Sequence, residues 1–282
     1  MKRTISALAV LLLWSLLLQG GEVPVMQETE EQQEQQETLA EPVSSGLRAG
    51  GGETAACLGS SQELSSWNDY LTLSEDEVYT FSQGPRAWKE GHAWGGEWCE
   101  YYVKGRSFGG FGCGLVCMAN IYSTLTPYEC SPLDMYHFAT EATGYYPTKQ
   151  SGAIDWGCMK SGLKELGFTC DLFYKPDTYE AFQEHIRRVD TAIVLVCSSD
   201  DDTYWEDTPG HYVNIWLYDE ETDQVFLGEP GALEKNRAWV PLQYVYDALK
   251  TSSKFQYLAV WNYEEEKNTW KWDGINDNWN KP

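Results

Sequence analysis

The chain has 282 residues, of which 42% are hydrophobic and 14% are aromatic, and its formal net charge is −23. This charge argues against nucleic acid as a partner, because phosphate binding requires a basic surface. The hydrophobic content excludes a wholly disordered chain and is sufficient for a folded core.

The first 21 residues have the pattern of a signal peptide. Met1-Lys2-Arg3 precedes an apolar run from Ile5 to Leu18, which is too short to cross a bilayer comfortably. We therefore predict that residues 1–21 are a signal peptide, or alternatively an uncleaved N-terminal anchor. The protein is then expected to be secreted, or associated with the cell surface at the extracellular face of the membrane.

An acidic, Gln-rich segment follows over residues 22–63. It holds nine acidic residues and one base, Arg48, and Gln, Ser and Gly make up nearly half of the remainder. Such a composition buries too little apolar surface to offset chain entropy, which predicts a disordered tether. Residues 64–282 are rich in Trp and Tyr and have the length of one ordinary domain.

Helix and strand signals can be recognised along most of this domain. Ser131 is a candidate N-cap with Pro132 at the first helical position, and Gly167 is expected to end the preceding helix. The continuous apolar run 191–197 is typical of a buried strand. Helices are expected over 115–125, 132–142, 154–166, 179–189 and, in a short form, 241–249. Strands are expected over 79–83, 191–197, 212–217, 224–227 and 255–261, with 212–217 and 224–227 forming a hairpin.

The segment 84–112 is rich in Gly and Trp and is expected to be a long ordered loop over an apolar surface. Helices come mainly before an antiparallel sheet, which defines an α+β fold. Eight cysteines occur in the chain, and we assign no disulfide pairs. The spacings typical of zinc ligands are absent from the sequence, so no metal and no cofactor are expected.

Cys113 is the strongest candidate for a reactive residue. It lies between Gly112 and Gly114, directly before a helix-compatible run. The partial positive charge at a helix N-terminus favours thiolate over thiol, and the thiolate is the nucleophile. The alternative is that Cys113 is an unreactive, small hydrophobic side chain buried in the core. This is our interpretation of Cys117, Cys158 and Cys197.

A cysteine nucleophile needs a base and a group that orients the base. His211 follows Pro209-Gly210 and opens a predicted strand, whereas the other three histidines lie on helices or in the Gly-rich loop. Across the hairpin, Glu229 ends the partner strand and can lie beside His211. Asn214 is an alternative orienting group only if the strand bulges, because regular alternation sends its side chain to the other face.

These residues resemble the papain-like cysteine peptidases of the double-glycine leader (bacteriocin-processing) type and their exported bacterial relatives. The resemblance rests on Gly112-Cys113-Gly114 with its helix, Gly210-His211-Tyr212-Val213, and Glu229-Pro230, with Ser82-Gln83 upstream. It implies a papain-like fold in which Cys113 is the nucleophile, His211 the general base, Glu229 the orienting group and Gln83 an oxyanion donor. Glu stands where the family has Asp, and Gln83 lies unusually far before Cys113.

The resulting hypothesis is a monomeric, exported cysteine hydrolase that acts as a peptidase on a peptide or protein substrate. An amidase or acyl transferase acting on cell-wall peptide would use the same residues. The alternative from another class is a catalytically inactive papain-like module whose Trp and Tyr side chains bind peptide or glycan.

Overall fold

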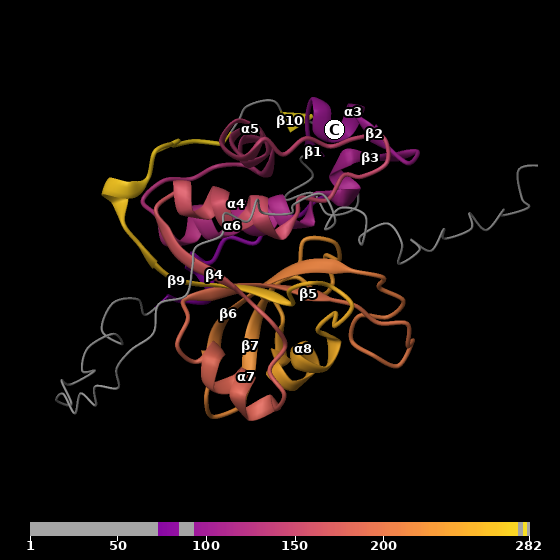
Figure 1. The fold of residues 1–282 in the computed structure, drawn as a ribbon, viewed down its shortest axis with the longest axis vertical. Coiled ribbons are helices and arrows are strands. Elements are labelled where there is room, and N and C mark those ends of the chain that lie inside the picture. Colours follow the sequence, from indigo (N-terminus) through magenta and orange to yellow (C-terminus); the bar gives the residue numbers. More distant parts are fainter. Residues whose placement is uncertain (1–72, 85–92, 276–278, 281–282) are drawn as a thin grey trace, which may run out of the picture.

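The computed structural model of the chain describes residues 73–84, 93–275 and 279–280. Two predicted segments, 1–21 and 22–63, lie outside the described residues, as do Cys57, Trp88 and His92. Within the described part, an antiparallel sheet lies between two helical layers (Figure 1). The prediction of helices packed on an antiparallel sheet is therefore confirmed.

The described sheet has six strands in the order β4-β9-β5-β6-β7-β8, and each neighbouring pair is antiparallel. β5 lies between β9 and β6, and all its side chains are buried because both faces of the sheet are covered. The strands are β4 (Phe168–Phe173), β5 (Thr191–Val196), β6 (His211–Asp219), β7 (Gln224–Gly228), β8 (Trp239–Pro241) and β9 (Tyr257–Tyr263).

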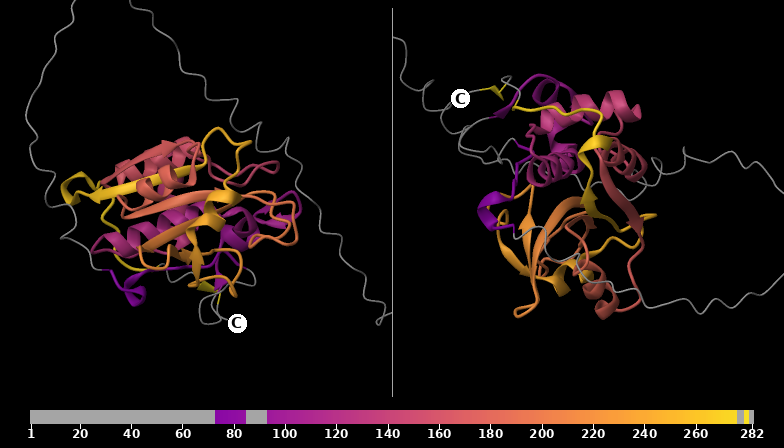
Figure 2. Two further views of the ribbon diagram at one scale, coloured as in Figure 1. Left: turned by 90° about the horizontal axis from the view of Figure 1, so that it is seen from below. Right: turned by 90° about the vertical axis from the view of Figure 1, so that its left-hand side faces the viewer.

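One helical layer consists of α4 (Cys113–Leu125), α5 (Pro132–Thr143) and α6 (Trp156–Glu165), and the other of α7 (Tyr179–Ile186) and α8 (Leu242–Ala248). The two layers lie on opposite sides of the sheet in both orientations (Figures 1 and 2). Side chains of β6 alternate between them: Tyr212 and Trp216 join the core under α4, whereas Val213 and Ile215 join the core under α7 and α8.

Local sequence explains the helix boundaries. Ser131 and Asp134 form a capping box at the start of α5, with Pro132 at the first helical position. Asp155 caps α6 by accepting a hydrogen bond from the Cys158 N–H, and Thr178 caps α7 in the same way. The predicted helices are confirmed with small shifts at their ends.

The prediction of a strand over 79–83 is wrong. The segment is extended, but side chains and one loop carbonyl, that of Pro230, bind its backbone in place of a neighbouring strand. The Phe81 N–H donates to Asn120 Oδ1 at 2.8 Å, and the Ser82 carbonyl accepts from Trp94 Nε1 at 2.7 Å. The alternating pattern correctly indicated an extended chain but could not reveal the kind of partner.

The segment 84–112 is also more regular than the loop that we predicted. Its described part holds β1 (Ala93–Trp94), α3 (Glu97–Glu100), β2 (Tyr102–Val103), β3 (Arg106–Ser107) and η3 (Phe108–Phe111). The prediction also missed β4 and β8, which are the two edge strands of the sheet. Three short elements complete the described chain: η1 (Glu75–Glu77), η4 (Glu265–Lys267) and β10 (Trp279–Asn280), the last of which pairs with β1.

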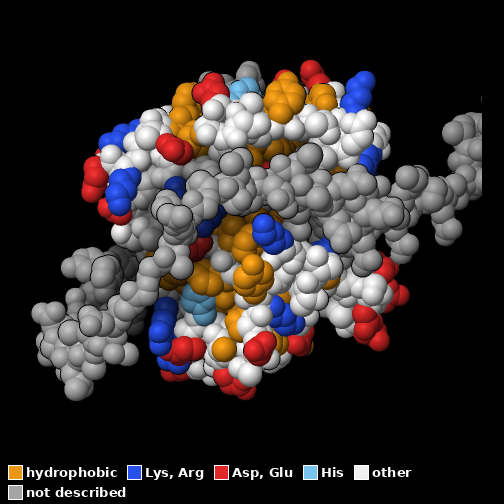
Figure 3. Space-filling view, in the orientation of Figure 1, with side chains coloured by type: hydrophobic (Ala, Val, Ile, Leu, Met, Phe, Trp, Pro, Cys, Tyr) orange, Lys and Arg blue, Asp and Glu red, His pale blue; other side chains and the backbone are white. Residues whose placement is uncertain are grey.

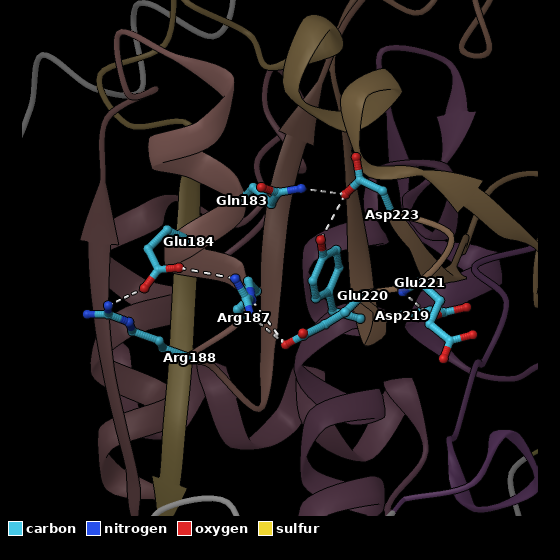
Figure 4. A network of polar contacts seen from close by, with 9 residues as sticks. Gln183, Glu184, Arg187, Arg188, Asp219, Glu220, Glu221 and Asp223 are labelled. Atoms are coloured by element: carbon cyan, nitrogen blue, oxygen red, sulfur yellow. Dashed lines mark hydrogen bonds and ion pairs between the residues drawn. The ribbon is translucent and has the colours of Figure 1, made fainter. Parts of the chain in front are cut away.

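Polar contacts join α7 to the turn between β6 and β7 (Figure 4). Arg187 forms an ion pair with Glu220 across this contact, and Asp223 accepts hydrogen bonds from Gln183 Nε2 and the Tyr218 hydroxyl. These contacts fix the hairpin at the end remote from His211. In Figure 3, hydrophobic side chains gather below the grey trace and along the upper edge, whereas Asp and Glu side chains lie mainly toward the margins of the face.

Within the described residues, no helix is both long enough and apolar enough to cross a bilayer.

Candidate functional site

Cys113 is the first residue of α4 and is 8% exposed. The 3-10 turn η3 leads directly into it, and Gly109 and Gly112 of this turn accommodate the buried Trp98 indole: a Cβ on Gly112 would lie 2.4 Å from the ring. Because the first N–H groups of a helix have no partner within the helix, the sulfur lies beside backbone donors and partial positive charge.

Cys117 lies one turn further along α4 and differs sharply from Cys113. Burial raises the pKa of its thiol well above the ordinary value, and the negative charges nearby raise it further. A fully buried thiol of this kind is inert at neutral pH. Cys130, Cys158 and Cys170 are also free thiols whose pKa values burial raises.

His211 is the first residue of β6, and its side chain is 15% exposed. Its Nε2 is in hydrogen-bond contact with Glu229 Oε1, and Cys113 lies close enough to the ring to raise its pKa. Burial lowers the pKa of His211, but the charge of Glu229 and the hydrogen bonds with Cys113 and Glu229 outweigh it and raise the pKa to about 10. The imidazole is therefore charged at neutral pH.

Glu229 follows the end of β7 and is 1% exposed. Its Oε1 accepts a hydrogen bond from the Gly231 N–H at 2.8 Å, and its Oε2 accepts one from Trp205 Nε1 at 3.1 Å. Burial raises the pKa of this carboxyl, but the combined effect of His211 and the two donors is larger and opposite. The pKa of Glu229 is therefore lowered. Both oxygens are thus held, and the side chain is suited to the carboxylate form.

The structure brings Cys113, His211 and Glu229 together, and it places Gln83 beside them with a different set of contacts. Gln83 Nε2 donates to the carbonyl of Gly110, in the turn before Cys113, at 3.3 Å. Its Oε1 is buried and has no hydrogen-bond partner among the described residues. The Gln83 backbone lies between the Glu229 loop and Trp98: its N–H donates to Pro230 O at 2.8 Å, and its carbonyl accepts from Trp98 Nε1 at 2.8 Å.

Asn214 forms its hydrogen bonds with α4 rather than with His211. It is fully buried, and its Oδ1 accepts a hydrogen bond from Asn120 Nδ2 at 3.0 Å. Asn120 Oδ1 in turn accepts from the Phe81 N–H. This network joins β6, α4 and the segment that carries Gln83.

The other described histidines are remote from Cys113. His185 Nδ1 lies 2.7 Å from the hydroxyl of Tyr257, and burial followed by the charge of Arg188 lowers its pKa. His137 is exposed on α5 and meets the Tyr136 ring edge-on.

Sequence reasoning missed three residues that support the site. Trp205, in an acidic loop, and the backbone of Gly231, directly after Pro230, each donate a hydrogen bond to the Glu229 carboxylate. The side chain of Asn236 accepts a hydrogen bond from the Glu229 backbone N–H. A Cβ on Gly231 would lie 3.0 Å from Cε1 and 3.1 Å from Nε2 of His211. Of the three, only Gly231 had a sequence signal, because a glycine at a strand end allows the backbone to lie close to a neighbouring side chain.

A separate open hollow of about 580 Å³ lies near the β6–β7 turn and contains none of the candidate residues. Its lining consists of Glu184, Arg187, Arg188, Val189, Asp190, Glu220 and Trp261. Among the described residues there is no group of three or more His, Cys, Asp or Glu side chains that could hold a metal ion.

No known protein family matches the sequence, and no curated protein matches it. Among solved structures, the chain is similar to the peptidase domain of Streptococcus ComA, a bi-functional ABC transporter involved in a quorum-sensing pathway. The two share 15% sequence identity at a TM-score of 0.37, over 54% of this chain and 90% of that one. A likeness of this size carries no functional inference, so the function must follow from the site itself.

Proposed function

We propose that the protein is a papain-like cysteine peptidase in which Cys113 is the nucleophile, His211 the general acid and base, Glu229 the orienting carboxylate and Gln83 an oxyanion donor. One observation carries the proposal: a thiol at a helix start lies beside an imidazole whose Nε2 contacts a buried carboxylate. Nucleophilic catalysis by cysteine requires this arrangement of thiol, base and orienting group.

The charges of the pair set the resting state. Because the pKa of His211 is raised to about 10, the imidazole carries a proton at neutral pH. The imidazolium and the helix N-terminus both place positive charge beside the sulfur of Cys113, on the side from which it attacks the substrate. Glu229 balances the imidazolium from the opposite side, and its contact through Nε2 leaves Nδ1 for the sulfur.

The reaction then has two balanced halves. The Cys113 thiolate attacks the scissile carbonyl carbon, and His211 gives its proton to the departing amine as the C–N bond breaks, which leaves a thioester. Neutral His211 next takes a proton from water as the water oxygen attacks the thioester. The carboxylic acid product leaves, and the thiolate–imidazolium pair is restored.

The oxyanion formed in each half needs hydrogen-bond donors in place before the reaction. The backbone N–H of Cys113 at the start of α4 is one candidate. Gln83 Nε2 is the other, and in the free protein it has a long hydrogen bond of 3.3 Å to Gly110 O. We expect this amide to exchange that weak contact for the oxyanion when substrate binds.

The extra methylene of Glu229 relative to Asp fits this site. Trp205 Nε1 and the Gly231 N–H hold the two carboxylate oxygens, so the longer side chain is fixed at its far end. This observation favours an active site over an inactive binding module, because an unused carboxylate buried to 1% exposure would be costly to keep.

The decisive experiment uses the full chain with two matched variants. Cys113→Ala and Cys117→Ala remove thiols one helical turn apart. We expect the wild type and Cys117→Ala to cleave members of a peptide library and to react with iodoacetamide at Cys113, and Cys113→Ala to do neither. Equal cleavage by Cys113→Ala and wild type would refute the proposal, and turnover of amides or acyl acceptors but not peptides would redirect it to the sub-alternative.

We further propose that the enzyme is exported and acts as a monomer on a peptide or protein outside the cytoplasm. The support is the basic and apolar pattern of residues 1–21, which is independent of the site. N-terminal sequencing of protein from the culture medium and from the membrane fraction distinguishes a cleaved signal from a retained anchor.

A further inference from the structure

Asn236 lies in the loop between β7 and β8, and its side-chain amide has two partners on different segments. Its Oδ1 accepts a hydrogen bond from the Glu229 N–H at 2.9 Å. Its Nδ2 donates to the carbonyl of Thr80 at 2.9 Å, across a sequence separation of 156 residues. One side chain therefore spans the gap between the loop that carries Glu229 and the segment that carries Gln83.

A second contact joins the same two segments on the other side of Glu229. The N–H of Gln83 donates to the carbonyl of Pro230 at 2.8 Å. The Asn236 bridge at Thr80 and this backbone bond at Gln83 hold the two stretches side by side from Thr80 to Gln83. Because neither stretch is paired in the sheet there, their relative position depends on these few hydrogen bonds.

The neighbouring residue provides a natural comparison. Arg237 also binds the early segment, with Nη1 donating to Val78 O at 2.9 Å and Nη2 donating to Glu75 O at 2.7 Å. Arg237 Nη1 also donates a longer hydrogen bond of 3.3 Å to Oγ1 of Thr80, the residue whose carbonyl Asn236 binds, but none of these contacts involves Glu229. Asn236 and Arg237 thus share the anchoring role, and only Asn236 connects it to the orienting carboxylate.

We infer that Asn236 is a positioning residue that couples the Glu229 carboxylate to the Gln83 amide, so that the base side and the oxyanion side of the site move as one unit. This inference rests on the proposed function. The amide suits the task because it offers an acceptor to one segment and a donor to the other. Alanine offers neither, and aspartate keeps the acceptor but lacks the donor.

The experiment compares Asn236→Ala, Asn236→Asp and Arg237→Ala in the full chain, with thermal unfolding followed for each. Turnover is measured on the best peptide from the library, and His211 is titrated by NMR of the ¹⁵N-labelled imidazole. For Asn236→Ala we expect about a tenfold or greater loss in kcat with little change in KM, and a lower titration midpoint of His211, because the Glu229 loop loses a support.

Asn236→Asp separates the two halves of the bridge. It keeps the acceptor for the Glu229 N–H, so the His211 midpoint should not fall, yet kcat should drop because Thr80 loses its donor. Coupling is tested with Gln83→Ala: its effect on kcat should be clearly smaller in the Asn236→Ala background than in the wild type, and unchanged in the Arg237→Ala background.

Two results would overturn the inference: equal effects of Asn236→Ala and Arg237→Ala on kcat and the His211 midpoint, or full additivity with Gln83→Ala. If Asn236→Ala does not fold, Asn236→Asp carries the test of kcat and the test of additivity with Gln83→Ala. If the wild type neither cleaves peptides nor reacts at Cys113, the proposed function fails. In that case the His211 midpoint in the Asn236 variants still decides whether the bridge positions Glu229.

Discussion

Replacing Glu229 by Gln tests the electrostatics of the site most directly. The substitution keeps the size and hydrogen-bonding capacity of the side chain and removes its negative charge. That charge is the leading cause that holds the pKa of His211 at about 10, against a burial effect of opposite sign. Without it, burial remains, and we expect the pKa of His211 to fall to its ordinary value of 6.5 or below.

The size of the effect follows from these two values. A fall from about 10 to 6.5 corresponds to roughly 5 kcal/mol of lost preference for the imidazolium, at about 1.36 kcal/mol for each pH unit. At pH 7.5, about a tenth of the His211 rings would then carry a proton, instead of nearly all of them. If the thiolate of Cys113 depends on the imidazolium, its alkylation rate at this pH should fall about tenfold or more.

The assay is an NMR titration of both proteins, combined with iodoacetamide kinetics at Cys113. His185 serves as an internal control because it contacts Tyr257, on the other side of the sheet, and its midpoint should be the same in both proteins. A wild-type His211 midpoint near 6.5, or a midpoint that Glu229→Gln leaves unchanged, would refute the reasoning.

The same pair also predicts a dependence of stability on pH. A histidine whose folded pKa is raised contributes stability that is fully present below the unfolded value of 6.5 and is lost as pH rises through about 10. The lowered pKa of Glu229 acts in the opposite sense, because its contribution is lost as pH falls below 4.5. The free energy of unfolding of wild type should therefore exceed that of Glu229→Gln most between about pH 4.5 and 6.5.

Three further predictions concern residues around the site and beyond it. Asn120→Ala leaves Asn214 and a backbone N–H buried without their partner, so urea unfolding should show a loss of about 1–3 kcal/mol, and a neutral result would contradict the network. Gly231→Ala places a Cβ about 3 Å from the His211 ring, so iodoacetamide labelling of Cys113 should slow several-fold with little change in melting temperature. Burial raises the pKa of Asp190 from 3.8 to about 6, so the penalty develops as pH rises from 3.8 to 6. Asp190→Asn should therefore stabilise the protein by ~1–2 kcal/mol at pH 8, by about half as much at pH 5 and by almost nothing at about pH 3, and equal effects at all three pH values would exclude this cause.

Much of the fold could be predicted because its signals are local. The cap at Ser131, the helix-compatible run after Cys113 and the apolar run of β5 each depend on residues within a few positions of one another. The position of Glu229 was also accessible, because the pairing of Asn214 with Gly228 follows from the length of the hairpin and brings the strand ends together.

The missed features depend on distant partners. In the edge strand β4, polar and apolar residues alternate imperfectly, so the sequence indicates a strand only weakly. Hydrogen bonding to β9 stabilises the extended conformation there. The segment 79–83 looks like a strand, but asparagine and tryptophan side chains from elsewhere take its hydrogen bonds. Asn236 has no local signal at all, because its role is defined by a contact across 156 residues.

The four candidate residues come from three parts of the fold, and this division explains why the supporting polar side chains matter. Cys113 belongs to the helical layer, His211 and Glu229 to the ends of neighbouring strands, and Gln83 to a segment outside the sheet. Hydrophobic packing stabilises each part but is tolerant of small shifts between them. The asparagine bridges supply directional contacts across the joints, and a reaction that needs its groups aligned to a fraction of an ångström would depend on them.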